Sequence, residues 1–313
     1  MRDTFVRTLI EIAKQDRNVL LVTGDLGFGV LKPFWEKLPG QFINIGIDEQ
    51  NMTGFAAGLS LEGKTVFTYS IGNFPTLRCL EQIRNDCAYH NANVKIVCVG
   101  GGFVYGALGM SHHATEDLGV MRALPGVSIF APADLAEAEA ATWAIYNQPG
   151  TCYLRLGRGG EPRLHSSPVS EKNVLSAIKC NDGRDAVIFS TGAIADEVVE
   201  AIKLLNEKGV DIAYYTFPRL KPIDGKTICE CAEKYPYIFT VEEHNVIGGV
   251  GSVVAEFVSS LEIGEGKNKA IVKRIGIQDE YCSIVGTQKY LRIQNQIDGS
   301  GIFKTILGYL MCR

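Results

Sequence analysis

The amino-acid sequence predicts an α/β protein with two doubly wound, mostly parallel-sheet domains. Short apolar runs of strand type alternate with amphipathic helical patterns along the chain, which is typical of parallel sheets covered by helices. Residues 161–185 interrupt the alternation with a polar segment that contains proline and glycine, and we expect a linker there. The length of 313 residues, of which 46% are hydrophobic, suits two domains that each bury a core. We therefore expect domains at residues 1–160 and 186–313.

Each domain has its own series of predicted elements. In the first domain we expect strands near Val19–Thr23, Phe42–Ile47, Thr65–Ser70, Val94–Val99, Val127–Phe130 and Cys152–Arg155, and helices near Thr4–Asp16, Asn51–Leu61, Leu77–His90 and Leu135–Tyr146. In the second we expect strands near Ala186–Ser190, Ile212–Phe217, Ile238–Val241 and Ile271–Ile275, and helices near Ile194–Glu207, Val250–Ser260 and Ile302–Leu310. The fold alone assigns no function, because this architecture hosts many chemistries.

Composition and charge argue against several classes of protein. A net charge of −4 gives no electrostatic case for a nucleic-acid or anionic-lipid partner, and no apolar run reaches membrane-spanning length. The chain starts in an amphipathic helix and lacks the apolar core of a signal peptide. Cysteines such as Cys98 and Cys152 lie in strand-like runs, so we expect reduced, buried thiols in a cytoplasmic protein. The pair Cys229 and Cys231 is too close for a zinc knuckle, and we expect no metal ligands in this chain.

The most informative stretch is NIGIDEQNMTGFAAGLSLEGKTVF, residues 44–67. A hydrophobic strand ends at Ile47 and is followed by the carboxylates of Asp48 and Glu49 and by a helix rich in glycine and alanine. In open α/β sheets this position faces the ligand crevice. A carboxylate at a helix start can also serve as a cap, so the short motif alone leaves both roles open for Glu49.

This stretch resembles the Gly-Ile-x-Glu-Gln-type motif in the pyrimidine-binding domain of the transketolase group of thiamine-diphosphate enzymes. The resemblance implies that Glu49 hydrogen-bonds N1′ of the aminopyrimidine of the cofactor. That contact favours the imino tautomer, whose 4′-nitrogen removes the proton from C2 of the thiazolium ring. A carboxyl group in an apolar pocket suits the task, because burial favours its protonated form.

The segment YSIGNFPTLRCLEQIRND, residues 69–86, is similar to the family segment in which an aromatic ring stacks on the pyrimidine. The match implies that Phe74 stacks on the cofactor and contributes roughly 0.5–1.5 kcal/mol beyond its burial. Ile71 takes the place of a second aromatic residue that many members carry, so we place it among the cofactor-binding candidates. The match leaves two interpretations of Arg78, a substrate-binding residue in the active-site funnel or a surface residue of a helix.

A third resemblance covers residues 103–141, where members carry Asp-Gly-Pro-Thr-His followed by a helix. His112 falls on the family histidine that contacts the substrate near the thiazolium, where an imidazole can donate a hydrogen bond or exchange a proton near neutral pH. His113 is a second substrate-binding candidate. The following pattern, Arg-x-x-Pro-Gly and Pro-Ala-Asp-x-x-Glu at residues 122–137, favours transketolase over the β subunits of 2-oxo acid dehydrogenases.

Two departures from the family pattern bear on the substrate. Leu108 stands where the family has an aspartate that reads a substrate hydroxyl, and a histidine that helps hold the substrate phosphate is replaced by glycine in residues 100–102. Arg158 retains a phosphate-contacting position. Because an apolar side chain cannot satisfy a buried hydroxyl, we expect either a sugar phosphate or a modified, sulfonated, deoxy or nucleotide-linked sugar.

Residues 186–313 resemble the carboxyl-terminal domain of the family, which carries no catalytic residues. The glycine-rich turn at residues 248–251 lacks the full spacing of a dinucleotide site, so we prefer a tight strand-to-helix connection. Two roles stay open for the run Glu242, Glu243 and His244, which could line an interface or form an anion site.

The amino-terminal domain of the family, with its Gly-Asp-Gly…Asn motif for metal and diphosphate, has no counterpart in this sequence. The nearest approach is Gly24–Gly27, and its Asp25 is a further cofactor-binding candidate. The resemblance therefore implies a partner, an amino-terminal subunit that binds the diphosphate and Mg²⁺ or Ca²⁺, in an α2β2 heterotetramer with active sites at the interfaces.

The leading hypothesis is the carboxyl-terminal half of a split transketolase, which transfers a two-carbon ketol unit from a ketose to an aldose. The catalytic candidates are Glu49 and His112. The alternatives are a half that resembles deoxyxylulose-phosphate synthase, the β subunit of a 2-oxo acid dehydrogenase, and a non-catalytic scaffold subunit that kept the fold.

Overall fold

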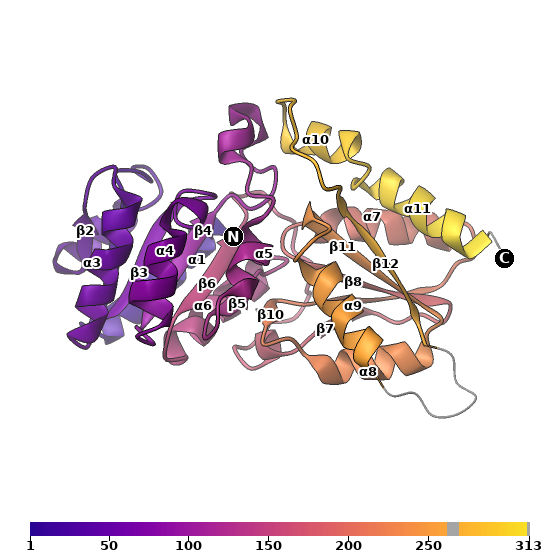
Figure 1. The fold of residues 1–313 in the computed structure, drawn as a ribbon, viewed down its shortest axis with the longest axis horizontal. Helices are drawn as coiled ribbons and strands as arrows, with labels where there is room; N and C mark the ends of the chain where they lie inside the picture. Colours follow the sequence, from indigo (N-terminus) through magenta and orange to yellow (C-terminus); the bar gives the residue numbers. More distant parts are fainter. Residues whose placement is uncertain (262–268, 312–313) are drawn as a thin grey trace.

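The fold consists of two mostly parallel sheets with helices packed against them, which confirms the predicted class (Figure 1). The computed structural model describes residues 1–261 and 269–311. The predicted second domain, residues 186–313, includes positions 262–268 and 312–313, which lie outside the described residues.

The first sheet has seven strands in the order β10-β5-β6-β4-β3-β1-β2. Its strands are β1 (Val19–Thr23), β2 (Phe42–Asn44), β3 (Thr65–Ile71), β4 (Val94–Val99), β5 (Ser128–Phe130), β6 (Cys152–Leu156) and β10 (Arg219–Lys221). The helices of this half are α1 (Arg2–Gln15), α2 (Lys32–Lys37), α3 (Glu49–Leu61), α4 (Leu80–Gln82), α5 (Asp117–Ala123) and α6 (Leu135–Asn147). All neighbouring strands are parallel except β10, which runs antiparallel to β5.

The second sheet has five strands in the order β12-β11-β8-β9-β7. Its strands are β7 (Ile178–Asn181), β8 (Ala186–Thr191), β9 (Ile212–Thr216), β11 (Tyr237–Asn245) and β12 (Ile271–Ile277). The accompanying helices are α7 (Ala195–Asn206), α8 (Gly225–Lys234), α9 (Val250–Ser260), α10 (Gln288–Gln294) and α11 (Gly299–Met311). Only β7 is antiparallel to its neighbour, β9.

The structure differs from the sequence-based expectations in several places: for example, the strand expected at Phe42–Ile47 ends at Asn44, and the helix α8 was not expected. Three further differences concern the sheets and the candidate site. Residues 161–185, expected as a linker, contain the edge strand β7 of the second sheet. Strand β10 lies in the carboxyl-terminal half of the chain but extends the first sheet, where Ala131 N–H donates to the carbonyl of Pro218 at 2.7 Å. The single helix expected at Leu77–His90 is a 3₁₀ turn (Leu77–Cys79), a short α segment and a π-helical segment (Ile83–Ala88). This change of winding lies directly beside the candidate site.

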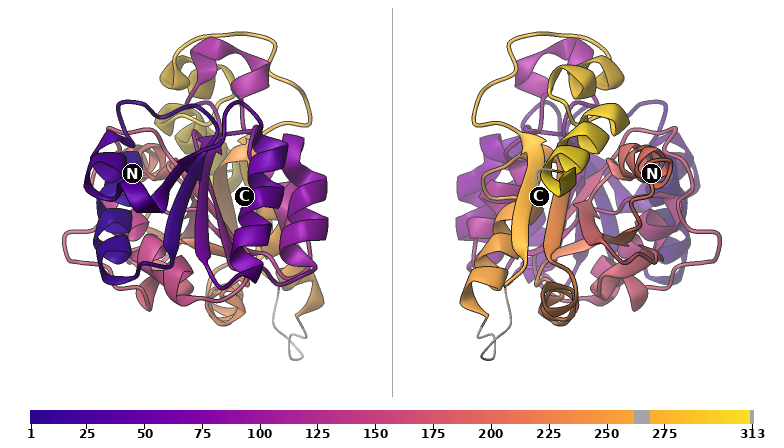
Figure 2. Two further views of the ribbon diagram at one scale, coloured as in Figure 1. Left: turned by 90° about the vertical axis from the view of Figure 1, so that its left-hand side faces the viewer. Right: turned by 90° about the vertical axis from the view of Figure 1, so that its right-hand side faces the viewer.

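Two segments from different halves of the chain project together from the body of the molecule. They are α10 and the helical turns Gly106–Leu108 and Met110–His112, which lie side by side in Figures 1 and 2. The N–H of Gly286 donates to the carbonyl of Gly106 at 3.3 Å, and a Cβ added at Gly106 would come within 2.5 Å of Leu291. Glycine at position 106 therefore permits the close approach of the two segments.

Candidate active site

The predicted site residues follow the carboxyl ends of neighbouring strands in the first sheet. Asp25 follows β1, Glu49 follows β2, Phe74 follows β3, and residues 100–113 follow β4. Because β2, β1, β3 and β4 are adjacent and parallel, these segments meet at one edge of the sheet. This is the edge at which open α/β sheets bind ligands.

Glu49 is the first residue of α3, and the cap of that helix is its neighbour Asp48. The Asp48 carboxylate accepts a hydrogen bond from the N–H of Asn51 at 3.2 Å, whereas only 2% of Glu49 is exposed. Gly24 borders the Glu49 side chain, since a Cβ built at Gly24 would lie 3.7 Å from the Cγ of Glu49. The alternative of a capping role thus applies to Asp48 and leaves the Glu49 carboxylate available for another purpose.

The Glu49 carboxylate is buried, but its surroundings are more polar than the expected apolar pocket. Ser70, in β3, donates to Oε1 at 3.3 Å, and Arg78 donates from Nη1 to Oε2 at 2.7 Å. The Arg78 side chain remains 46% exposed. Arg78 therefore matches neither of the two interpretations of the sequence, an unpaired surface residue or an unpaired residue of the active-site funnel, because it forms an ion pair with Glu49.

Phe74 connects this ion pair to the histidine loop. The guanidinium carbon of Arg78 lies 4.6 Å from the centroid of the Phe74 ring, a cation–π contact. The ring of His112 meets Phe74 edge-on, with centroids 5.1 Å apart and planes at 71°. Four predicted residues, Glu49, Arg78, Phe74 and His112, thus form one continuous series of contacts.

The two adjacent histidines have different environments. His112 is partly exposed, and its Nδ1 lies 3.0 Å from the hydroxyl of Ser111. Partial burial, with a smaller contribution from His113, lowers the pKa of His112 below its usual value, so the ring is neutral at pH 7. His113 is 3% exposed, contacts the ring of Phe103 edge-on, and lies with Nε2 3.2 Å from the carbonyl of Gly106. His113 therefore lies within the loop and supports it from inside.

The remaining candidates lie around this group. Ile71 ends β3 and is half-buried, and Leu108 is 57% exposed on the projecting turn. Asp25 has a positive φ of 57°, and its Oδ1 accepts a hydrogen bond from the Asn44 side chain at 3.0 Å. Arg158 is exposed after β6, with its guanidinium carbon 5.6 Å from the centroid of the Tyr105 ring. Within the described residues, none of these four side chains forms a direct hydrogen bond or ion pair with Glu49.

The residues that anchor the histidine loop are Glu243, whose role the sequence left open, and Gln288 and Arg292, which the sequence did not single out. The N–H of Phe103 donates to Oε1 of Glu243 at 2.8 Å, and Arg292 donates from Nη2 to Oε2 of Glu243 at 2.7 Å. Gln288 reaches both carboxylate oxygens, at 3.0 and 3.1 Å. The available signal was the run of Glu242, Glu243 and His244 inside an apolar strand, because buried charges need internal partners.

The glycine-rich turn before α9 is a strand-to-helix connection. The Glu242 carboxylate accepts hydrogen bonds from the N–H groups of Val250 at 2.8 Å and Gly251 at 3.0 Å. A Cβ at Gly249 would come within 1.7 Å of Oε2 of Glu242. Burial raises the pKa of Glu242 to about 7. This helix start is thus occupied by a side chain of the protein itself, which argues against a dinucleotide site.

One other cluster has the geometry of a metal site. Ligand atoms of Asp134, Glu137 and His165 lie within 4.8 Å of one another. Both Glu137 oxygens already accept hydrogen bonds, Oε2 from the N–H of Ala133 at 2.6 Å and Oε1 from Thr216 at 2.6 Å, and His165 Nε2 lies 2.7 Å from Oε1. These contacts join α6, β9 and the segment after residue 160 through the protein's own side chains.

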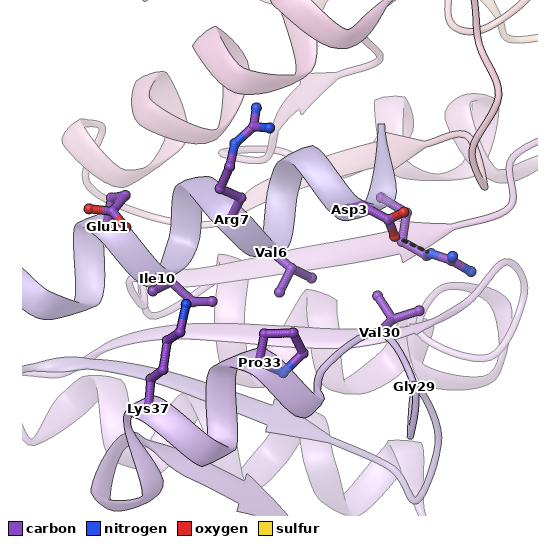
Figure 3. Close-up of a pocket in the computed structure, with 10 residues that line it drawn as sticks. Asp3, Val6, Arg7, Ile10, Glu11, Gly29, Val30, Pro33 and Lys37 are labelled. Carbon is purple, nitrogen blue, oxygen red and sulfur yellow. Dashed lines mark hydrogen bonds and ion pairs between the residues drawn. The ribbon is translucent and has the colours of Figure 1, made fainter.

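A separate cavity of about 510 Å³ lies between α1 and residues 29–37 (Figure 3). Val6, Ile10, Val30 and Pro33 contribute apolar surface to it, and Lys37 extends along its border. None of the predicted site residues lines this cavity. Within the described part of the chain, no helix is both long and apolar enough to cross a membrane.

Comparisons with known proteins find similarity over the whole chain. The family model "Transketolase, pyrimidine binding domain" matches residues 1–177, and "Transketolase, C-terminal domain" matches residues 176–294. One of the subunits of apulose-4-phosphate transketolase from Phocaeicola vulgatus is 36% identical, over 99% of this chain and 97% of that protein. The 6-deoxy-6-sulfo-D-fructose transketolase subunit SqwH from a Clostridium species is 32% identical, over 93% of this chain and 88% of that protein. A solved structure described as a split gene transketolase, inactive beta4 tetramer, superposes with a TM-score of 0.86 at 31% identity, covering 99% of this chain and 97% of that one.

Proposed function

Because the chain belongs to the transketolase family, we propose that it is the carboxyl-terminal subunit of a split, thiamine-diphosphate-dependent transketolase. The proposed reaction transfers a two-carbon ketol unit from a ketose to an aldose. The observation that carries the proposal is the position of Glu49. Its carboxylate is buried at the ligand edge of the sheet, is not used as a helix cap, and is connected to Phe74 through Arg78.

The residues at this edge fit the aminopyrimidine part of the cofactor. A flat cationic group, the guanidinium of Arg78, already packs over Phe74 while it donates a hydrogen bond to Glu49, so the two side chains accept a planar donor. When bound, thiamine diphosphate would supply a carbon nucleophile for the ketose carbonyl and an electron sink for cleavage of the neighbouring carbon–carbon bond. We propose that Glu49 hydrogen-bonds N1′ while Ser70 holds the other carboxylate oxygen. Phe74 and Ile71 would pack against the ring, and Asp25 is a further cofactor candidate.

On the substrate side we propose His112 as the residue nearest the reacting carbons. Its neutral ring can donate a hydrogen bond or exchange a proton at pH 7. His113 supports the same loop from within, and Arg158 is the proposed phosphate contact. Leu108 replaces a carboxylate, which favours a substrate without the corresponding free hydroxyl. The names of two relatives, with apulose 4-phosphate and 6-deoxy-6-sulfo-D-fructose, support a sugar phosphate or a sulfonated deoxy sugar as the substrate.

We propose that the partner is an amino-terminal subunit that binds the diphosphate together with Mg²⁺ or Ca²⁺, in an α2β2 heterotetramer. Large apolar side chains are exposed near the carboxyl edge of the first sheet: Phe28 at 61%, Ile47 at 78%, Leu108 at 57% and Met110 at 56%. We propose that these side chains contact the partner, because exposed apolar surface is typical of an interface. A subunit that covers them would also enclose Glu49.

The proposal is tested by product analysis with the co-expressed pair of subunits. Ketol transfer from a ketose to an aldehyde, dependent on thiamine diphosphate and a divalent metal, is the expected activity. Condensation of pyruvate with an aldehyde favours the deoxyxylulose-phosphate synthase alternative, and oxidative decarboxylation of a 2-oxo acid favours the dehydrogenase alternative. An active pair whose rate does not change on Glu49→Gln would identify this chain as a scaffold.

A further inference from the structure

Arg78 makes two contacts that the proposed function assigns to the cofactor. Its Nη1 donates to Oε2 of Glu49 at 2.7 Å, where the proposal places N1′ of the aminopyrimidine. Its guanidinium carbon lies 4.6 Å from the centroid of the Phe74 ring, where the proposal places the stacked pyrimidine. One planar group makes both contacts at the same time.

The shape and charge of the guanidinium explain why it can do so. A guanidinium is flat and delocalised, packs over aromatic faces and carries N–H donors directed in its plane. An aminopyrimidine is also flat and presents polar nitrogen atoms in its plane. A flat group that touches both Glu49 and Phe74 fills the space between them, so the guanidinium and the pyrimidine cannot occupy it together.

We infer that Arg78 is a placeholder for the aminopyrimidine: it occupies the pyrimidine half-site in the unloaded subunit and leaves it when the cofactor binds. This inference rests on the proposed function. Before loading, Arg78 neutralises a buried carboxylate, since Glu49 is 2% exposed, and keeps both Glu49 and the Phe74 ring in position. Arg78 is therefore a positioning residue for the empty half-site rather than a substrate-binding residue.

The surroundings of Arg78 allow it to leave. Its side chain is 46% exposed, and among the described residues Glu49 is the only group that accepts a hydrogen bond from it. Arg78 belongs to the short 3₁₀ turn Leu77–Cys79. Its backbone is held in place by the hydrogen bond from the Arg78 N–H to the carbonyl of Asn73 at 3.3 Å. The guanidinium can therefore turn toward solvent by rotation of its own side chain.

The first part of the test uses the isolated chain of 313 residues. Arg78→Met should lower the urea midpoint of unfolding, whereas Arg84→Met should not. Arg84 is exposed six positions later, and its side chain donates to Asn85. Arg78→Lys, which keeps the charge, should recover part of the loss. The double variant Glu49→Gln/Arg78→Met should be no less stable than Arg78→Met alone, because the two residues act as a pair.

The second part measures binding of thiamine diphosphate with Mg²⁺ to the co-expressed complex by isothermal titration calorimetry. Because the placeholder reduces the fraction of empty sites that can accept the ring, Arg78→Met should lower the cofactor Kd by about three- to tenfold. A purely structural role predicts the opposite sign, since a damaged site binds more weakly. Arg84→Met should leave the Kd unchanged.

The outcomes separate the placeholder role from the proposed function. If the wild-type complex binds no cofactor, the proposed function fails and this inference fails with it. If the wild-type complex binds the cofactor but Arg78→Met leaves the Kd unchanged or raises it, only the placeholder role is overturned. A lower Kd in Arg78→Met, together with coupling to Glu49 in the isolated chain, supports the role.

Discussion

The backbone N–H of Phe103 donates to the carboxylate of Glu243 at 2.8 Å, although the two residues are 140 positions apart in the chain. Phe103 lies near the start of the loop that carries His112, and Glu243 lies in β11 of the second sheet. Arg292 holds the same carboxylate from the other side, at 2.7 Å. The second half of the chain thus fixes the base of a loop whose tip contacts Phe74.

This relationship predicts an effect of Glu243→Gln on both stability and substrate use. The variant keeps an acceptor for Phe103 but removes the charge that faces Arg292, so the isolated chain should lose about 1–3 kcal/mol of unfolding free energy in urea. In the assembled enzyme, KM for the sugar should rise more than kcat falls, because the loop is displaced while the cofactor site is intact. Glu230→Gln is the control, since its carboxylate lies on the exposed side of α8, 3.8 Å from Lys226. A Glu243→Gln variant as stable as this control would contradict the anchoring role.

The lowered pKa of His112 predicts the position of an acid limb in the activity profile. Burial disfavours the charged ring, so the folded protein binds this proton less tightly than an unfolded chain does. The neutral form therefore persists as pH falls below 6.5 and is lost only at more acidic pH. The limb of kcat/KM should lie below pH 6.5, and His112→Asn should lower kcat/KM by roughly 10²-fold and abolish the limb. A limb that survives in His112→Asn would assign it to another group.

The hydrogen bond to Glu137 raises the pKa of His165, which predicts that His165 stabilises the fold more at acidic pH than at alkaline pH. A folded-state pKa above the unfolded value contributes stability below about pH 6.5, and this contribution is lost as pH rises through the folded pKa. His165→Asn should therefore cost about 1–2 kcal/mol in urea unfolding at about pH 5.5 and less at about pH 8.5. The acids facing His165 are Glu137 and Asp134, and Asp134 accepts hydrogen bonds from the N–H groups of residues 164 and 165. An equal cost at both pH values would show that the imidazole charge does not contribute.

The order of strand and helix around Glu49 could be predicted from the sequence because it depends on local patterns, although the strand expected at Phe42–Ile47 ends earlier, at Asn44. The apolar run before Asp48 and the acids after it place Glu49 after β2, and the structure begins α3 at that residue. The fold class follows from the same alternation. Strand β10 could not be predicted in this way, since its three residues carry no periodic pattern and pair with β5 only through tertiary contact.

The contacts between side chains within the site could not be predicted from the sequence either. The sequence spacing of Glu49 and Arg78 does not predict their 2.7 Å ion pair. The pair joins the start of α3 to the 3₁₀ turn that follows β3, and only the tertiary fold brings these two elements together. The different surroundings of His112 and His113 depend on packing against Phe74 and Phe103. Adjacent residues of one loop reach opposite sides of it, and no local pattern distinguishes them.

The most direct test of the central claim measures the exchange of the thiazolium C2 proton of bound thiamine diphosphate by quenched-flow hydrogen–deuterium exchange and NMR. Removal of that proton is the step that the Glu49 carboxyl group is proposed to promote. The measurement needs no sugar substrate, so the identity of the sugar does not have to be known. In the assembled complex, Glu49→Gln should slow this exchange by at least about 10²-fold while the subunits stay associated and the cofactor remains bound. Exchange at the wild-type rate in an intact, cofactor-loaded Glu49→Gln complex would contradict the proposed role of this residue.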